Sequence, residues 1–312
     1  MIKPDVLVLV PIFLPTLKQL EERYTVHKLW LAKDPTLFLK AVGPRIRAVV
    51  TTGIHGCEAA IFDVLPKLEI VACFGTPRNT LPLDKAHERS IVCCRTPDAI
   101  TQTVADLALG LLVDSMRRIT SSDRYLRAGA WEQAPAPAGD EVYARSCGIV
   151  GFGAIGQAVA KRVSAMDMKI SYFGPRKKET HYAYYPDLVA LAKAVDVLVI
   201  CCPLTDQTRG LVNREVLQAL GPEGYLINVA RGPVVDESAL IEALQQNKIA
   251  GAGLDVFWDE PRVPNALMEL DNVVMVPHIG SNTKQIRLER GRKVLLNLQA
   301  HFEGQPVPFL VV

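Results

Sequence analysis

The chain has 312 residues, a length that predicts two domains of ordinary size. Hydrophobic residues make up 49% of the sequence and charged residues 22%, a balance that excludes a disordered or collagen-like chain. Thirty-five Lys and Arg residues nearly balance 33 Asp and Glu residues, giving a net charge of +2. Nucleic-acid binding usually requires a basic excess, so we expect no nucleic-acid partner.

The first third of the chain alternates short apolar runs with helical segments. We expect strands at 6–10, 48–51, 70–74 and 90–94, and a helix at 16–24. The runs are continuously apolar, which is typical of parallel strands that are buried on both faces. Apolar residues recur at helical spacing over 101–119, which predicts a long helix, whereas the prolines of 131–140 predict a loop.

A second alternation of strands and helices follows from residue 148 onwards. We expect strands at 148–150, 169–173, 195–201, 224–229, 251–256 and 272–276, and helices at 155–166, 238–246 and 288–302. Strands and helices in strict rotation indicate right-handed crossovers and a doubly wound parallel sheet.

No segment of the sequence resembles a membrane span or a signal peptide. The most apolar stretches, 6–14 and 195–202, are shorter than the roughly 18 residues that a span needs. None of the seven cysteines belongs to a Cys-x-x-Cys pair, and most lie in strand-like runs. We therefore expect buried, reduced thiols, no metal site and a cytoplasmic protein.

The sequence Gly151-Phe152-Gly153-Ala154-Ile155-Gly156 is a G-x-G-x-x-G motif between a predicted strand and a predicted helix. In such a motif the first glycine allows a tight turn, and the second lets the backbone approach a pyrophosphate. The third lets the helix pack closely on the strand, and the helix N-terminus supplies N–H donors. The motif therefore predicts dinucleotide binding; the alternative is a tight turn without a ligand.

The end of the next strand bears on which dinucleotide is bound. An NAD site usually has an acidic residue there, about 20 residues after the glycines, for the ribose 2′-OH. Here the strand is followed by Gly174-Pro175-Arg176-Lys177-Lys178, with no acid before Glu179. Arginine and lysine can pair with a 2′-phosphate, so we expect NADP(H) in preference to NAD(H). The alternative is a solvated basic turn.

Three later stretches place polar residues after predicted strands. Arg231 follows the strand at 224–229, and Glu260 and His278 follow the next two strands along the chain. Ligands of a doubly wound sheet bind beyond the carboxyl ends of its strands, so these three side chains can converge near the cofactor.

With the glycine loop, these stretches resemble the D-2-hydroxyacid dehydrogenase family, from about Ile46 to Gly304. The basic turn and Tyr184-Tyr185-Pro186 look most similar to NADPH-dependent glyoxylate/hydroxypyruvate and hydroxyphenylpyruvate reductases. The resemblance implies an α/β protein with a Rossmann-type dinucleotide-binding domain at 100–285. It implies a flavodoxin-like substrate domain that is formed by 1–99 and 286–312.

The resemblance also implies a homodimer that forms through the glycine-loop domain. The helix at 101–119 is a candidate contact because much of its surface is apolar. The alternative, burial of this helix within its own subunit, explains the same apolar surface equally well.

The resemblance assigns a role to each of the three polar residues. Arg231 would bind the carboxylate of a 2-oxo acid and polarise its carbonyl, a task that suits the rigid fork of guanidinium donors. His278 would protonate the carbonyl oxygen while the cofactor supplies hydride. Glu260, hydrogen-bonded to His278, would favour the imidazolium and orient the ring. The alternatives are a structural ion pair for Arg231, a loop-end acid for Glu260 and a structural histidine.

The resemblance also implies which residues contact the ligands. The expected cofactor contacts lie in the glycine loop, the basic turn and the loops at the strand ends: Gly151, Gly153, Ala154, Ile155, Gly156, Gly174, Arg176, Lys177, Cys202, Pro203, Thr208, Val229, Ala230, Asp255 and Gly280. The expected substrate contacts are Phe74, Gly75, Thr76 and Arg231. Among the cofactor contacts, Asp255 resembles the family position close to the nicotinamide.

One wall of the expected substrate site departs from the family pattern. The loop at 74–80 contains Pro77, which has no N–H to offer a substrate carboxylate, so Gly75 or Thr76 must supply that donor. Arg78 either contacts an acidic substrate or faces water, and Arg95 stands where the family commonly has Asn. These differences affect the identity of the substrate, not the type of reaction.

We weigh three hypotheses for function. The leading one is NADPH-dependent reduction of small 2-oxo acids of the glyoxylate/hydroxypyruvate type to D-2-hydroxy acids, or of an aromatic 2-oxo acid such as hydroxyphenylpyruvate. The second is a dinucleotide-sensing, corepressor-like binding protein, supported only by the unusual loop at 75–79. The third is an enzyme for a non-carboxylate acid such as a phosphonate, which Arg78 and Arg95 would permit.

Overall fold

The computed structural model describes residues 3–77, 80–97 and 100–311. The chain divides into two compact units, Met1–Ala99 with Thr283–Val312, and Ile100–Asn282. The expected domain boundary after residue 285 falls inside helix α12 (Lys284–Phe302). Among the helices of the described residues, none is long and apolar enough to cross a membrane.

The first unit contains a five-stranded parallel sheet with the order β2-β1-β3-β4-β5. This order is the flavodoxin-like one, so the expected architecture of the substrate domain is confirmed. Its strands are β1 (Asp5–Val8), β2 (Thr25–Lys28), β3 (Ile46–Thr52), β4 (Ile70–Phe74) and β5 (Val92–Cys94). Its helices are α1 (Leu14–Arg23), α2 (Pro35–Val42), α3 (Ala59–Asp63), α4 (Leu83–Glu88) and α12, with 3-10 turns η1 (Leu29–Leu31) and η2 (Gly43–Arg45).

Both faces of this sheet are covered, which explains its continuously apolar strands. Helices α2, α3 and α4 pack on one face, and α1 and α12 pack on the other. The fully buried Asn297 of α12 fastens the returning C-terminal segment to the sheet: its Nδ2 donates to the Arg95 carbonyl at 3.1 Å, and its Oδ1 accepts from the Phe309 N–H at 3.3 Å.

The second unit contains a seven-stranded parallel sheet with the order β12-β11-β10-β9-β6-β7-β8. Counted within the unit, this is the Rossmann order with one additional strand, so the expected doubly wound sheet is also confirmed. Its strands are β6 (Ser146–Val150), β7 (Lys169–Phe173), β8 (Ala183–Tyr185), β9 (Val197–Ile200), β10 (Tyr225–Asn228), β11 (Gly251–Leu254) and β12 (Val273–Met275).

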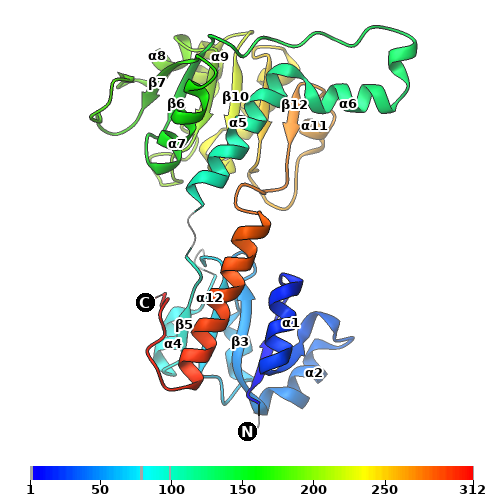
Figure 1. Ribbon diagram of the computed structural model, residues 1–312, viewed down its shortest axis with the longest axis vertical. Coiled ribbons are helices and arrows are strands. Elements are labelled where there is room, and N and C mark those ends of the chain that lie inside the picture. The colour runs from blue at the N-terminus through cyan, green and yellow to red at the C-terminus, as the bar shows by residue number, and fades with distance from the viewer. Residues whose placement is uncertain (1–2, 78–79, 98–99, 312) are drawn as a thin grey trace. The chain divides into compact units, whose positions relative to one another are not determined.

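The helices of the second unit lie on both faces of its sheet. They are α5 (Thr101–Arg117), α6 (Ile119–Arg127), α7 (Ala154–Ser164), α8 (Leu188–Lys193), α9 (Arg214–Leu220), α10 (Glu237–Gln245) and α11 (Asn265–Met268), with 3-10 turns η3 (Ala130–Glu132) and η4 (Gly232–Val234). Helices α5 and α7 lie side by side over one face (Figure 1), whereas α8, α9 and α10 pack on the other. Helix α5 thus buries Leu111, Leu112 and Met116 within its own unit.

Two edge strands are among the elements that were not predicted from the sequence. The edge strands β2 and β8 were not expected: β2 mixes polar and apolar residues, and β8 is only three residues long. The long helix expected at 101–119 ends at Arg117, because Arg118 adopts a left-handed backbone conformation with φ of 56° before α6 begins.

Candidate active site

The glycine loop of the second unit fits a pyrophosphate, and each glycine has its own steric reason. Gly151 has φ of +94°, and a Cβ there would lie 2.6 Å from the backbone of Cys202. A Cβ on Gly156 would lie 2.2 Å from the Gly151 carbonyl oxygen, so only glycine lets α7 pack this closely on the loop. Gly153, by contrast, has no atom within 4 Å of its Cβ position. The loop is therefore tight on the protein side and open at the glycine that would face the ligand.

Gly153 is the N-cap residue of α7, and Ala154 and Ile155 are the first two residues of that helix. The first N–H groups of a helix have no partner within the helix, so this end offers donors and positive potential to a phosphate. Backbone N–H groups around an open glycine can donate hydrogen bonds to a pyrophosphate.

The basic turn follows β7 directly at the carboxyl edge of the sheet. Gly174 is buried, and a Cβ there would again meet nothing within 4 Å. Arg176 and Lys177 are exposed, so both cations can reach a ligand that lies along this edge.

The loop after β9 approaches the glycine loop through its backbone. Cys202 is buried at 8% exposure, and burial raises the pKa of its thiol to about 11. The Thr208 hydroxyl donates to the Pro203 carbonyl at 2.6 Å and accepts from the Thr205 N–H at 2.7 Å. The structure thus gives the hydroxyl of Thr208 a local role in shaping this loop.

The structure brings Glu260 and His278 together. Oε2 of Glu260 lies 2.6 Å from Nδ1 of His278, and the two side chains are only 27% and 20% exposed. The other carboxylate oxygen, Oε1, accepts from the Phe257 N–H at 3.2 Å. One carboxylate therefore fixes both its own loop and the orientation of the imidazole ring.

His278 is held in a backbone conformation that non-glycine residues rarely adopt, with φ of 52°. The buried Asp255 holds this segment in place. Its carboxylate accepts from the N–H groups of Ile279 at 2.6 Å and Gly280 at 3.0 Å, and its carbonyl accepts from the His278 N–H at 2.9 Å. Burial raises the pKa of Asp255, and the two N–H donors act in the opposite direction.

Arg231 follows β10, beyond the buried Val229 and Ala230. Its Nη1 donates to the Ala230 carbonyl at 2.5 Å. The loop is shaped by Asn228, which is 1% exposed: its Oδ1 accepts from the Ala230 N–H at 3.0 Å, and its Nδ2 donates to the Arg231 carbonyl at 3.2 Å. This role of Asn228 was not predicted, although a polar residue that ends an apolar strand is a detectable signal in the sequence.

The expected substrate loop of the first unit is also tightly organised. Phe74 is buried, and Gly75 has φ of +111°. The Gly75 N–H donates to Oγ1 of the buried Thr96 at 2.7 Å, and the Gly75 carbonyl accepts from the Thr96 N–H at 2.9 Å. Because the Gly75 N–H is already used, the exposed Thr76 is the better placed backbone donor of the two. Arg78 and Asn79 lie outside the described residues, and Arg95 is exposed.

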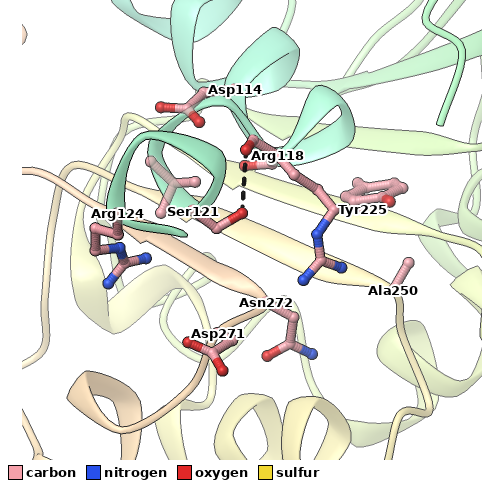
Figure 2. Close-up of a pocket in the computed structure, with 10 residues that line it drawn as sticks. Asp114, Arg118, Ser121, Arg124, Tyr225, Ala250, Asp271 and Asn272 are labelled. Carbon is pink, nitrogen blue, oxygen red and sulfur yellow. Dashed lines mark hydrogen bonds between the residues drawn. The ribbon is translucent and has the colours of Figure 1, made fainter. Parts of the chain in front are cut away.

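A polar cavity of about 20 Å³ lies at the opposite, amino-terminal edge of the same sheet (Figure 2). Tyr225, Ala250 and Asn272, at or just before the starts of β10, β11 and β12, line it together with Arg118. Ser115, whose buried hydroxyl has no partner among the described residues, lines it too. The residues of the candidate active site lie at the other edge of the sheet.

No group of three or more His, Cys, Asp or Glu side chains is placed to hold a metal ion in the described part of the chain.

A Rossmann sheet whose glycine loop fits a pyrophosphate, with an imidazole–carboxylate pair beyond its strand ends, defines a dinucleotide-dependent oxidoreductase. The chain belongs to the D-isomer specific 2-hydroxyacid dehydrogenase family, whose NAD binding domain matches residues 109–280. The expected family and enzyme class are thereby confirmed.

Relatives and solved structures agree over nearly the whole chain. The chain is 44% identical over 291 residues to hydroxyphenylpyruvate reductase of Plectranthus scutellarioides, covering 93% of each chain. It is 40% identical to 2-ketogluconate reductase of Gluconobacter oxydans, covering 96% of each. A solved structure of the NADPH-dependent glyoxylate/hydroxypyruvate reductase of Sinorhizobium meliloti with NADP and malonate has a TM-score of 0.80 at 36% identity, covering 99% of this chain and 97% of that one.

Proposed function

We propose that this enzyme reduces small 2-oxo acids of the glyoxylate/hydroxypyruvate type to D-2-hydroxy acids with NADPH. The observation that carries the proposal is the 2.6 Å contact between His278 and Glu260 beyond the strand ends of the dinucleotide-binding unit. A protein that only senses a dinucleotide has no use for such a proton donor, which argues against the corepressor-like alternative. The names of the relatives, which are reductases of 2-oxo acids, support the reaction type.

Each residue of the site has one task in this reaction. Nδ1 of His278 faces the Glu260 carboxylate, so the imidazolium would deliver the proton on its other nitrogen, Nε2, to the carbonyl oxygen of the substrate and become neutral imidazole. Glu260 keeps the ring oriented and compensates the charge of the imidazolium. Arg231 binds the substrate carboxylate through its fork of N–H donors. The dinucleotide, when its pyrophosphate is bound at the glycine loop, would supply the hydride from its nicotinamide.

The preference for NADPH is supported by the edge that follows β7. The turn at 174–178 has no carboxylate to bind a ribose 2′-OH, and it exposes Arg176 and Lys177, which can pair with a 2′-phosphate. The Sinorhizobium meliloti neighbour, described as NADPH-dependent, is consistent with this preference. NAD(H) would still fit the glycine loop, since that loop contacts only the shared pyrophosphate.

The first unit is the proposed substrate domain. We assign substrate binding to the unit formed by 1–99 and 283–312, with the Thr76 N–H as the backbone donor for the substrate carboxylate. The Plectranthus scutellarioides relative makes an aromatic 2-oxo acid the second candidate.

We further propose a homodimer in the cytoplasm. Helix α6 and the segment after it carry exposed apolar side chains, namely Ile119 at 54%, Leu126 at 56% and Trp131 at 66% exposure. All seven cysteines are free thiols, and burial raises the pKa of each, as suits a protein of a reducing compartment. Sedimentation equilibrium tests the dimer.

The deciding experiment measures oxidation of NADPH and of NADH with glyoxylate, hydroxypyruvate, pyruvate and 4-hydroxyphenylpyruvate. We expect turnover of glyoxylate and hydroxypyruvate and a higher kcat/KM with NADPH. No turnover of any 2-oxo acid would overturn the reaction, and a preference for NADH would overturn only the cofactor assignment. Fast turnover of 4-hydroxyphenylpyruvate alone would favour the aromatic substrate.

A further inference from the structure

Two tyrosine hydroxyls hold the two ends of the basic turn at 174–178. The hydroxyl of Tyr184, on β8, donates to the Gly174 carbonyl at 3.1 Å. The hydroxyl of Tyr172, on β7, accepts from the Lys178 N–H at 2.7 Å and lies 3.4 Å from the Lys178 carbonyl. Each hydrogen bond therefore fixes the backbone at one end of the segment that presents Arg176 and Lys177.

The tyrosines are themselves held by the sheet and by an aromatic cluster. Tyr172 and Tyr184 are directly paired in the register of β7 and β8, and their ring centroids are 5.4 Å apart. Tyr172 is fully buried, so its hydroxyl has no access to solvent and depends on the turn for its partners. Phe152, inside the glycine loop, stacks on Tyr172 with centroids 4.4 Å apart. The aromatic cluster thus joins the pyrophosphate loop and the basic turn in one packed group.

From this geometry we propose that Tyr172 and Tyr184 are positioning residues for recognition of the cofactor's 2′-phosphate, an inference that rests on the proposed preference for NADPH. Arg176 and Lys177 are exposed, and their long side chains have many rotamers. Their usefulness as phosphate ligands depends on a backbone that is already in place, because less ordering is then required on binding. The tyrosine hydroxyls provide that order without touching the cofactor.

The test replaces each hydroxyl by hydrogen and measures dinucleotide affinity by calorimetry. We expect Tyr184→Phe to weaken NADPH binding about fivefold, the effect of one lost hydrogen bond, and to leave NADH binding within about twofold. Tyr172→Phe leaves the Lys178 N–H without its partner, so we expect a larger loss, about tenfold, for NADPH alone. Circular dichroism and thermal unfolding check that both variants are folded.

Tyr182→Phe is the matched control. Its ring belongs to the same cluster, 5.8 Å from Phe152, but its hydroxyl has no hydrogen-bond partner among the described residues. We expect this variant to bind both dinucleotides like the wild-type enzyme.

The outcomes separate the inference from the cofactor preference on which it rests. If the wild-type enzyme binds NADPH no more tightly than NADH, the cofactor preference fails and the inference fails with it. If the wild-type enzyme does prefer NADPH, the inference alone is overturned when Tyr172→Phe and Tyr184→Phe match Tyr182→Phe. It is also overturned when these variants weaken NADPH and NADH binding equally, because the tyrosines would then be merely structural.

Discussion

Replacing Gly232 by alanine perturbs the active-site loops without changing any residue that touches the substrate. Gly232 directly follows Arg231, and a Cβ there would lie 2.0 Å from the carbonyl carbon and oxygen of Phe257 and 2.5 Å from the Trp258 nitrogen. These are backbone atoms, which cannot rotate away as a side chain can. Reaching an ordinary contact of 3.4 Å requires a displacement of about 1.4 Å between the Arg231 loop and the loop that leads to Glu260.

A displacement of about 1 Å in a catalytic group can cost about 100-fold in rate, so we expect Gly232→Ala to lower kcat/KM for the 2-oxo acid by about that factor. NADPH binding should change less than kcat/KM, because the glycine loop and the basic turn follow other strands, β6 and β7. The assay is steady-state kinetics, together with calorimetric titration of NADPH and thermal unfolding.

Gly224→Ala is the control for a steric clash away from the chemistry. A Cβ at Gly224 would lie 2.4 Å from Cγ of Leu220, at the amino-terminal edge of the sheet. We expect this variant to be less stable but to keep its kcat/KM. A folded Gly232→Ala enzyme with wild-type kcat/KM would refute the idea that close packing of the two loops sets the catalytic geometry.

Three further predictions concern single side chains. His278→Ala should lower kcat by about 10²- to 10⁴-fold with nearly unchanged NADPH affinity; an equal loss of NADPH affinity would instead make His278 structural. Burial opposes ionisation of Asp196, but hydrogen bonds from Ser146 and the charge of Arg145 outweigh it and lower its pKa. The folded protein therefore loses this stabilisation as the pH falls below about 4, so urea unfolding at pH 7 should show Asp196→Asn destabilised by about 1 kcal/mol, and the difference should shrink in acid. Ser115→Ala should be neutral or stabilising by about 1 kcal/mol in the same measurement, because the buried hydroxyl has no partner in the described structure; a clear loss of stability would mean that it has one.

The central strands could be predicted because strands that are buried on both faces are continuously apolar in sequence. β9 (Val197–Ile200) and β10 (Tyr225–Asn228) are fully buried, and their apolar runs are evident. The edge strands could not be predicted in this way. β2 and β8 are short and partly exposed: β2 contains polar residues, and the three residues of β8 are too few for an apolar run to indicate a strand.

In the candidate site, the sequence indicated which side chains take part but not how the backbone of the loops is arranged. The residue types of Arg231, Glu260 and His278 indicated the roles that we propose for them, since few side chains can bind a carboxylate or deliver a proton near neutral pH. Hydrogen bonds between loops that are distant in the sequence could not be predicted. That the Gly75 N–H is taken by Thr96 depends on two segments that lie 21 residues apart in the sequence.

The backbone conformation of His278 could not be predicted from the sequence, because it depends on residues that are close only in the folded structure. Nothing in the side chain of histidine favours φ of 52°, so the conformation must be imposed by its surroundings. Asp255 imposes it with three hydrogen bonds to consecutive N–H groups, two through its carboxylate and one through its carbonyl. Asp255 lies at the end of β11, and His278 follows β12, its neighbour in the sheet. The sheet register therefore aligns the acid with the backbone that it holds, and the imidazole is directed toward Glu260 as a consequence.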